Sequence, residues 1–113
     1  METVRSFSRQ AAKAASLLRA LSNEQRLLIL CYLAEERELA VGQLGDRLDL
    51  SQSALSQHLA RLREEGIVAT RKQAQTIFYT VKDSNAQQVL ALLHDLFCPE
   101  LGRNEQDESN DHD

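Results

Sequence analysis

The sequence contains few of the residues that mark membrane proteins, secreted scaffolds or aromatic-rich cores. Among 113 residues there are no Trp, one Pro, two Cys, three Phe and two Tyr. Aliphatic side chains must therefore fill the core, and a chain of this length can bury one modest core. No apolar run approaches the roughly 20 residues that a membrane-spanning helix needs, and the N-terminus lacks a signal peptide's apolar centre. We therefore expect a cytoplasmic protein of one domain, with no membrane partner.

Motifs of enzymes are also missing from the sequence. There is no nucleophile elbow, no Gly-rich phosphate loop and no metalloprotease motif. Three serines, Ser51, Ser53 and Ser56, fall on one helix without a paired base, so hydrogen bonding explains them better than nucleophilic chemistry. We expect no enzymatic activity, no catalytic residue, no cofactor and no small-molecule substrate.

Charge is unevenly distributed along the chain. The net charge is −4, but residues 99–113 hold six acids and one Arg, which leaves residues 1–98 close to neutral. Residues 50–82 hold five bases and two acids. Local charge of this sign is what a DNA-binding surface requires. The acidic tail has no apolar periodicity, so residues 99–113 are predicted to be disordered and residues 1–98 to form the domain.

Apolar periodicity predicts helices at both ends of that domain. In the first helix, an apolar seam recurs at spacings of three and four, at Phe7, Ala11, Ala14, Leu18 and Leu21. A second helix, capped by Ser22 or Asn23, is apolar all round over residues 27–34 and is predicted to be the central buried element. A last helix from about Ser84 to Phe97 has a broad apolar face and ends before Pro99.

Residues 41–66 predict two helices joined by a tight turn. The first spans Val41–Leu48, and the second begins at Ser51, whose hydroxyl can cap it, and stops at Gly66. One face of the second helix is apolar, with His58 at its edge: Leu55, Leu59 and Leu62. The other face is small and polar: Ser53, Ser56, Gln57 and Ala60. A thin polar face suits a DNA major groove, where Gln can pair with a base edge, adenine being its usual partner.

A hairpin is predicted after Gly66. Val68, Ile77, Tyr79 and Val81 suit two antiparallel strands, with residues 71–76 as a cationic tip, and residues 39–41 suit a short strand or an extended lead-in. The fold class is therefore mainly α with a β-hairpin wing: four helices, two strands and a last helix in a winged helix-turn-helix. This core cannot cover the apolar faces of the first and last helices, so both are predicted to pair in a homodimer. Two reading helices roughly 34 Å apart would then fit a near-palindromic site on double-stranded DNA.

Four segments resemble the ArsR/SmtB family of dimeric winged-helix regulators: LSNEQRLLILCYL, LAVGQL, LSQSALSQHLARLREEGIV and RKQAQTIFYTV. The resemblance covers residues 11–98, and the last segment with Cys31 and Cys98 is similar to the thiol- and sulfide-sensing HlyU subgroup. It implies that Ser53, Ser56 and Gln57 read bases, while Arg71 and Lys72 hold the wing on the DNA backbone. Four further residues complete the expected DNA-binding set: Ser51, Gln52, Arg61 and Arg63. Control of virulence or toxin genes is a further implication of the resemblance.

The chain departs from the family's metal sensors in one informative place. Those proteins carry a Glu-Leu-Cys-Val-Cys pattern, whereas residues 38–42 here read Glu-Leu-Ala-Val-Gly, without either thiolate. The family's other metal site uses Asp and His along the last helix, where only Asp83, His94 and Asp95 are present. We therefore expect no metal site.

The two cysteines admit two interpretations. Cys31 lies among leucines and by itself suggests a packed core residue, while Cys98 ends the last helix, where packing is weaker. A lasting disulfide is not expected in a reducing cytoplasm, whereas a transient or sensing pair is. With the resemblance to thiol sensors, our prediction is a Cys31/Cys98 switch, redox or reactive-sulfur, that modulates DNA affinity. Two alternatives stay open: a ligand-independent regulator that competes with other promoter-bound proteins, and a metal-responsive repressor with an unrecognised site.

Overall fold

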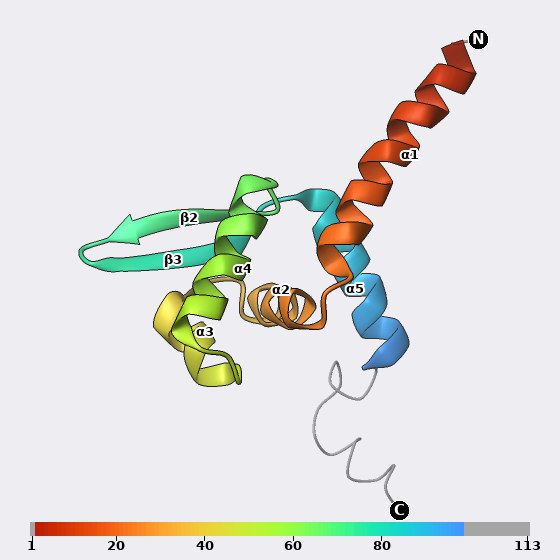
Figure 1. The fold of residues 1–113 in the computed structure, drawn as a ribbon. Coiled ribbons are helices and arrows are strands. Elements are labelled where there is room, and N and C mark those ends of the chain that lie inside the picture. Colours follow the sequence, from red (N-terminus) through yellow and green to blue (C-terminus); the bar gives the residue numbers. More distant parts are fainter. Residues whose placement is uncertain (1, 99–113) are drawn as a thin grey trace, which may run out of the picture.

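The computed structural model describes residues 2–98, with side chains from Val4 onward. In this part of the chain, five helices and three strands occur, in the order α1 (Glu2–Leu21), α2 (Glu24–Glu36), β1 (Leu39–Ala40), α3 (Val41–Arg47), α4 (Gln52–Glu64), β2 (Val68–Gln73), β3 (Thr76–Val81) and α5 (Ser84–Phe97). Figure 1 shows α1 and the β2–β3 wing projecting to opposite sides of a core of α2 to α5. The fold class predicted from the sequence is confirmed, and the lead-in at residue 39 forms a third strand. The predicted acidic tail lies outside the described residues.

Local signals in the sequence set the helix ends. The side chains of Asn23, Ser51 and Asp83 each accept a hydrogen bond from the backbone N–H three residues later, which satisfies a donor that helix geometry leaves unpaired. At the end of α4, Gly66 has a φ of 76° and its N–H donates to the carbonyl of Arg63, while the N–H of Ile67 donates to Leu62. These two bonds form a Schellman motif, so the predicted stop at Gly66 is confirmed.

α2 is the central element, but only one of its faces is buried. Ile29, Leu30 and Leu33 are fully buried and pack among α4, β3 and α5. The helix is central and buried on this face, as predicted, but its apolar residues are not all buried, because Leu28 and Cys31 lie on an exposed face of α2. Leu27 and Tyr32 pack against the edge of the core and are partly buried, so the core takes one face of this helix and leaves the opposite face at the surface.

The sheet has the order β1-β3-β2, and all of its pairs are antiparallel. In the hairpin, Arg71 pairs with Phe78, Lys72 with Ile77 and Gln73 with Thr76. The turn is therefore only Ala74 and Gln75, shorter than the predicted tip of residues 71–76. Arg71 and Lys72 belong to strand β2, and alternation along a strand sends their side chains to opposite faces of the wing.

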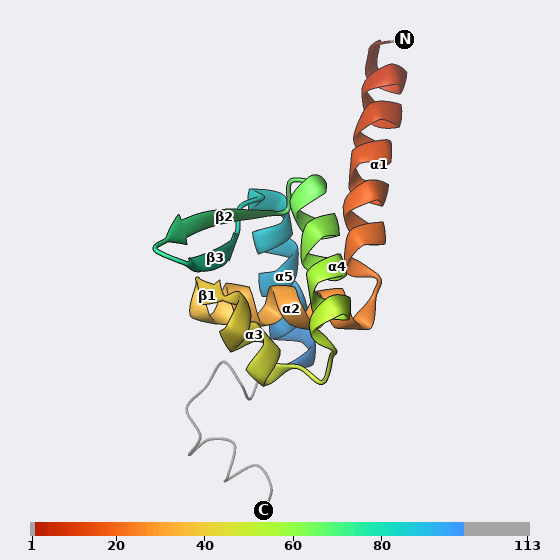
Figure 2. The same ribbon diagram turned by 60° about the vertical axis from the view of Figure 1, so that its left-hand side comes forward.

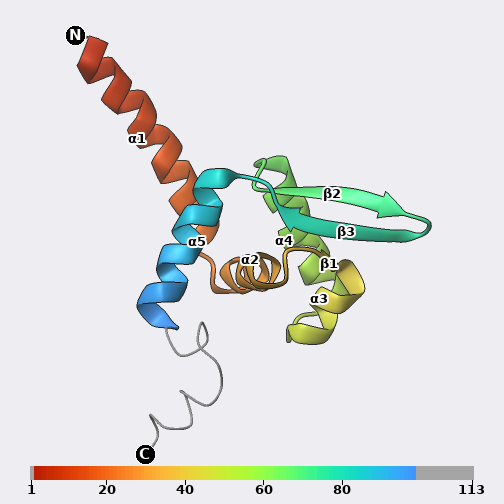
Figure 3. The ribbon, with the colours of Figure 1, turned by 180° about the vertical axis from the view of Figure 1, so that it is seen from behind.

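α1 and α5 leave large apolar side chains uncovered. In the rear view of Figure 3 the end of α1 overlaps the start of α5, and residues of both helices line one open pocket. The exposed apolar side chains of the two helices are Val4, Phe7, Leu18, Leu92, Leu96 and Phe97. Of the predicted seam of α1, only Leu21 is buried. Across residues 2–98, no helix has both the length and the hydropathy needed to cross a membrane.

The guanidinium of Arg26 makes hydrogen bonds between the start of α2 and the end of α1. Arg26 donates from Nε to the carbonyl of Ala20 at 2.8 Å and from a terminal nitrogen to that of Arg19 at 3.2 Å. These carbonyls belong to the last turn of α1, where the helix has no further donors and carries partial negative charge. Arg26 therefore caps α1 and ties it to the core.

Candidate nucleic-acid interface and thiol pair

α3 and α4 form the predicted helix-turn-helix, and α4 separates apolar from polar residues as its periodicity indicated. Leu55, Leu59 and Leu62 are buried against the core. The predicted base-reading side chains, Ser53, Ser56 and Gln57, are all exposed on the opposite side. Figure 2 shows α4 at the surface between α1 and α3. The buried leucines fix the rotation of α4, so its polar face must point away from the protein.

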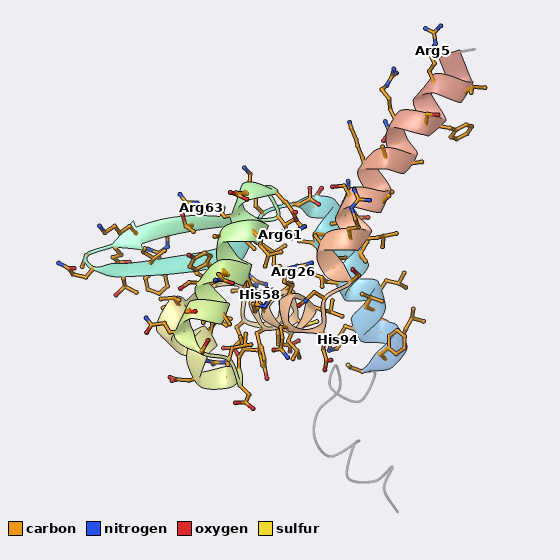
Figure 4. The ribbon with its side chains drawn as sticks, viewed as in Figure 1. Arg5, Arg26, His58, Arg61, Arg63 and His94 are labelled. Atoms are coloured by element: carbon orange, nitrogen blue, oxygen red, sulfur yellow. The ribbon has the colours of Figure 1, made fainter. Side chains whose placement is uncertain are left out.

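The remaining α4 candidates are exposed but differ in what they contact. Ser51 is engaged as the cap, since its Oγ accepts from the backbone N–H of Ala54 at 3.1 Å, and Gln52 follows it at the first turn. Arg61 pairs with Glu65 one turn later at 3.1 Å, an exposed contact that water screens. Arg63 has no ion-pair partner among the described residues, and both arginines project from the end of α4 in Figure 4.

A shallow groove runs between α4 and the wing. Its lining is Ser56, Ala60, Arg63, Glu64 and Tyr79. Tyr79 comes from β3, so the α4-facing side of the hairpin continues the exposed surface of α4. Lys72 lies on the same face of the sheet as Tyr79, because it pairs with Ile77, two residues along β3. Of the two predicted wing cations, Lys72 is therefore the one that shares the side of α4.

Arg71 lies on the other face of the wing and is bound within the protein. Its guanidinium donates from Nε and a terminal nitrogen to the two carboxylate oxygens of Glu38, at 2.7 and 2.8 Å, and from the other terminal nitrogen to Gln73 at 2.8 Å. It also stacks 4.5 Å from the ring centroid of Phe78. The hydrogen bond from Arg71 lowers the pKa of Glu38, and the same bond raises the pKa of Arg71. Sequence reasoning missed Glu38, because nothing local marks it as a partner of a residue 33 positions away.

Cys31 lies on α2, and Cys98 follows the last turn of α5. Cys31 is an exposed residue and Cys98 a half-buried one, and both are free thiols. Although Cys31 is exposed as a whole, desolvation of its thiol is the largest cause that raises its pKa, followed by the nearby charges of Cys98 and Glu35. The charge of Cys98 thus contributes to the raised pKa of Cys31, after desolvation. The interpretation of Cys31 as a packed core residue is wrong.

Cys31 lines an open groove of about 560 Å³ between α2, β3 and α5. Charged and titratable side chains share this groove: Glu35, Arg37, His94 and Asp95. Nε2 of His94 lies 3.8 Å from a carboxylate oxygen of Glu35, too far for a hydrogen bond, and is buried without another partner (Figure 4). Within residues 2–98, no cluster of three or more His, Cys, Asp or Glu could hold a metal ion.

His58 is a half-buried residue at the edge of the apolar face of α4, as predicted. Desolvation lowers its pKa, and the positive charge of Arg26 lowers it further. Figure 4 shows Arg26 and His58 between α2 and α4, away from the exposed face of α4. His58 therefore belongs to the packing of α4 on α2.

Comparison with known proteins agrees with this geometry. Residues 23–70 match the family described as "Bacterial regulatory protein, arsR family". The chain is 54% identical over 92 residues to the transcriptional activator HlyU of Vibrio cholerae, an alignment that covers 81% of this chain and 84% of that protein. It is 40% identical over 92 residues to the biofilm growth-associated repressor of Agrobacterium fabrum, covering 81% of this chain and 78% of the relative.

A solved structure shows the same similarity in three dimensions. Reduced HlyU from Vibrio cholerae superimposes with a TM-score of 0.79 at 53% identity, covering 83% of this chain and 98% of that one. Relatives of this similarity are transcriptional regulators and not enzymes. The chain is a DNA-binding transcriptional regulator that belongs to the arsR family of bacterial regulatory proteins.

Proposed function

We propose that the protein acts in the cytoplasm as a homodimer that binds a near-palindromic promoter site, with its DNA affinity set by the Cys31/Cys98 thiol pair. The observation that carries the DNA-binding part is the exposed polar face of α4, held outward by three buried leucines. Ser53, Ser56 and Gln57 would contact base edges there. Phosphates on either side would be contacted by the remaining exposed polar and cationic residues: Ser51, Gln52, Arg61, Arg63 and Lys72.

The uncovered apolar side chains of α1 and α5 support the dimer. Phe7 and Leu18 on α1, with Leu92, Leu96 and Phe97 on α5, are more than half exposed in the single chain. Large apolar side chains gathered on adjacent helices mark an association surface, and a second copy would bury them. Twofold symmetry would place two copies of α4 in successive major grooves, roughly 34 Å apart. Residues 1–98 would thus serve both DNA binding and dimerisation.

The places of Cys31 and Cys98 in the fold support the switch. Cys31 belongs to α2, which packs against α4, and Cys98 ends α5, which carries part of the dimer surface. A covalent link, as a disulfide or through an additional sulfur, would join the DNA-reading core to the dimer surface. It would change the spacing of the two α4 helices. We carry over from the resemblance to HlyU the expectation that the regulated genes include toxin or virulence genes.

One experiment tests this function. The DNA affinity of the reduced protein is compared with that of protein treated with a disulfide oxidant or with a polysulfide, on a duplex that the protein itself selects from a random pool. Sedimentation of the same samples reports the oligomeric state. A monomer that binds DNA equally in all three states would refute both the dimer and the switch.

A further inference from the structure

We propose that Glu38 and Arg71 form a clamp that orients the wing on DNA, so that Arg71 is a positioning residue and Glu38, although an acid, strengthens DNA binding. The proposal rests on the contact between wing and DNA in the proposed function. Charge alone predicts that removing Glu38 strengthens DNA binding, whereas the clamp predicts that removing it weakens DNA binding.

The clamp spans all three strands of the sheet. Glu38 immediately precedes β1, Arg71 lies on β2, and β3 runs between them. Ala40 pairs with Phe78, and Phe78 pairs with Arg71, so these side chains form one row on one face of the sheet. The Arg71 guanidinium lies over the Phe78 ring and reaches the Glu38 carboxylate beyond it. One side chain therefore ties the outer strand of the wing to the chain that leaves α2.

Most of the Arg71 guanidinium is engaged within the protein. The two carboxylate oxygens of Glu38 and the amide oxygen of Gln73 take three of its five N–H donors, and the ring of Phe78 covers one face of the group. Lys72, on the opposite face, lies on the side of α4, whose polar surface meets the major groove. Lys72 would thus contact DNA and Arg71 would anchor the wing, from neighbouring positions on opposite faces of the sheet.

Exposed ion pairs usually contribute little to the stability of a fold, but the Glu38–Arg71 pair has features of the pairs that contribute more. It is bidentate, it belongs to a network with Gln73, and it includes a cation–π contact. The hairpin otherwise projects from the core, as Figure 1 shows, and β1 contributes only Leu39 and Ala40 to the sheet. A short edge strand needs such a clamp if the wing is to keep one orientation.

The test measures DNA affinity over a range of salt concentrations for full-length Glu38→Ala, Arg71→Ala, their combination and Lys72→Ala, with circular dichroism to confirm folding. Glu38→Ala and Arg71→Ala should each weaken binding by about three- to tenfold, and the double variant should be no worse than either single one. The log–log salt slope of Arg71→Ala should stay at the parental value. Lys72→Ala, the matched control, should lower that slope by about one unit.

A charge exchange separates positioning from a structural effect of truncation. The double reversal Glu38→Arg with Arg71→Glu rebuilds the ion pair, so it should bind more tightly than the single reversal Arg71→Glu. The proposal is overturned if Glu38→Ala binds as the parent or more tightly, or if Arg71→Ala lowers the salt slope. Unchanged binding in all variants, Lys72→Ala included, would also overturn it, while Gln57→Ala would still report separately on DNA reading by α4.

Discussion

Glu35 and His94 lie 3.8 Å apart, carboxylate oxygen to Nε2, one helical turn after Cys31 and one turn before Cys98. Cys31 therefore lies one turn from Glu35 on α2, and Cys98 lies one turn from His94 at the end of α5. The contact between Glu35 and His94 places the two helices against each other in the region of both thiols. A direct disulfide between Cys31 and Cys98 needs a Cα–Cα separation of about 4.4–6.8 Å, and a bridge that contains an additional sulfur atom relaxes that limit.

The first prediction concerns this thiol pair. Oxidation should link Cys31 to Cys98 within one chain and weaken DNA binding by roughly 5–150-fold, the range of ordinary allosteric coupling. Because its pKa is raised, Cys31 should also react with an alkylating agent more slowly than a free thiol at neutral pH, and faster as the pH rises. Mass spectrometry of non-reduced peptides identifies the link, and a binding titration gives its effect.

Single serine variants provide the control for the switch. Cys31→Ser and Cys98→Ser should bind DNA like the reduced parent and should not respond to oxidant. If both variants still respond as the parent does, the thiol pair is not the switch.

The second prediction concerns base reading by α4. Gln57→Ala should weaken binding to the selected duplex by about 1–3 kcal/mol, because a bidentate contact to a base edge is lost. Gln57 is exposed, so the free energy of unfolding should barely change. Binding to a random-sequence duplex is the internal control. Equal losses on both duplexes would remove Gln57 from the base-reading set.

The third prediction concerns association of two chains. Leu93→Glu should produce a monomer or an unfolded chain, because Leu93 is half-buried already. Leu96→Glu is the sharper variant, since Leu96 is 62% exposed and its change cannot disturb the core of one chain. Sedimentation should show a folded monomer. Ser84→Glu adds the same charge at the exposed start of α5 and should stay dimeric, whereas a dimeric Leu96→Glu would place the interface elsewhere.

The fourth prediction concerns stability and pH. In the unfolded chain His58 binds a proton near pH 6.5, but desolvation and Arg26 lower that pKa in the folded protein. Below about pH 6.5 the unfolded state therefore holds more protons, and the free energy of unfolding falls as the pH falls towards the folded-state pKa. Urea unfolding at pH 7.5 and at pH 5.5 should show a smaller decrease for His58→Gln than for the parent. Equal decreases would mean that protonation of His58 does not destabilise the folded protein.

Much of the fold is visible in the sequence because local chemistry determines it. The period of Leu55, Leu59 and Leu62 fixes the buried face of α4, and hence the exposed positions of Ser53 and Gln57. Ser51 and Gly66 mark the helix ends by hydrogen bonds that span only a few residues. Such signals need no knowledge of the rest of the chain.

The features that escaped prediction depend on distant contacts or on unusual backbone. The wing turn contains Ala74 at a φ of 56°, a conformation that normally calls for Gly or Asn, so no turn residue marked its position. Arg71 is bound to Glu38 from another strand, which alternation along β2 alone cannot reveal. Cys31 lies in a run of apolar residues, and the packing of α4, β3 and α5 around α2 decides which of them reach solvent.

Arg26 connects the end of α1 with α4, since it donates to the last carbonyls of α1 and its charge also acts on His58 of α4. In the proposed twofold dimer, α1 of each chain carries part of the association surface and meets the core at Arg26. A small tilt of α1 at Arg26 would occur in both chains, with opposite sense, so the distance between the two α4 helices would change by more than either α1 helix moves. Protonation of His58 would place a second positive charge near the Arg26 guanidinium, and the repulsion between the two charges would act where α1 joins the core.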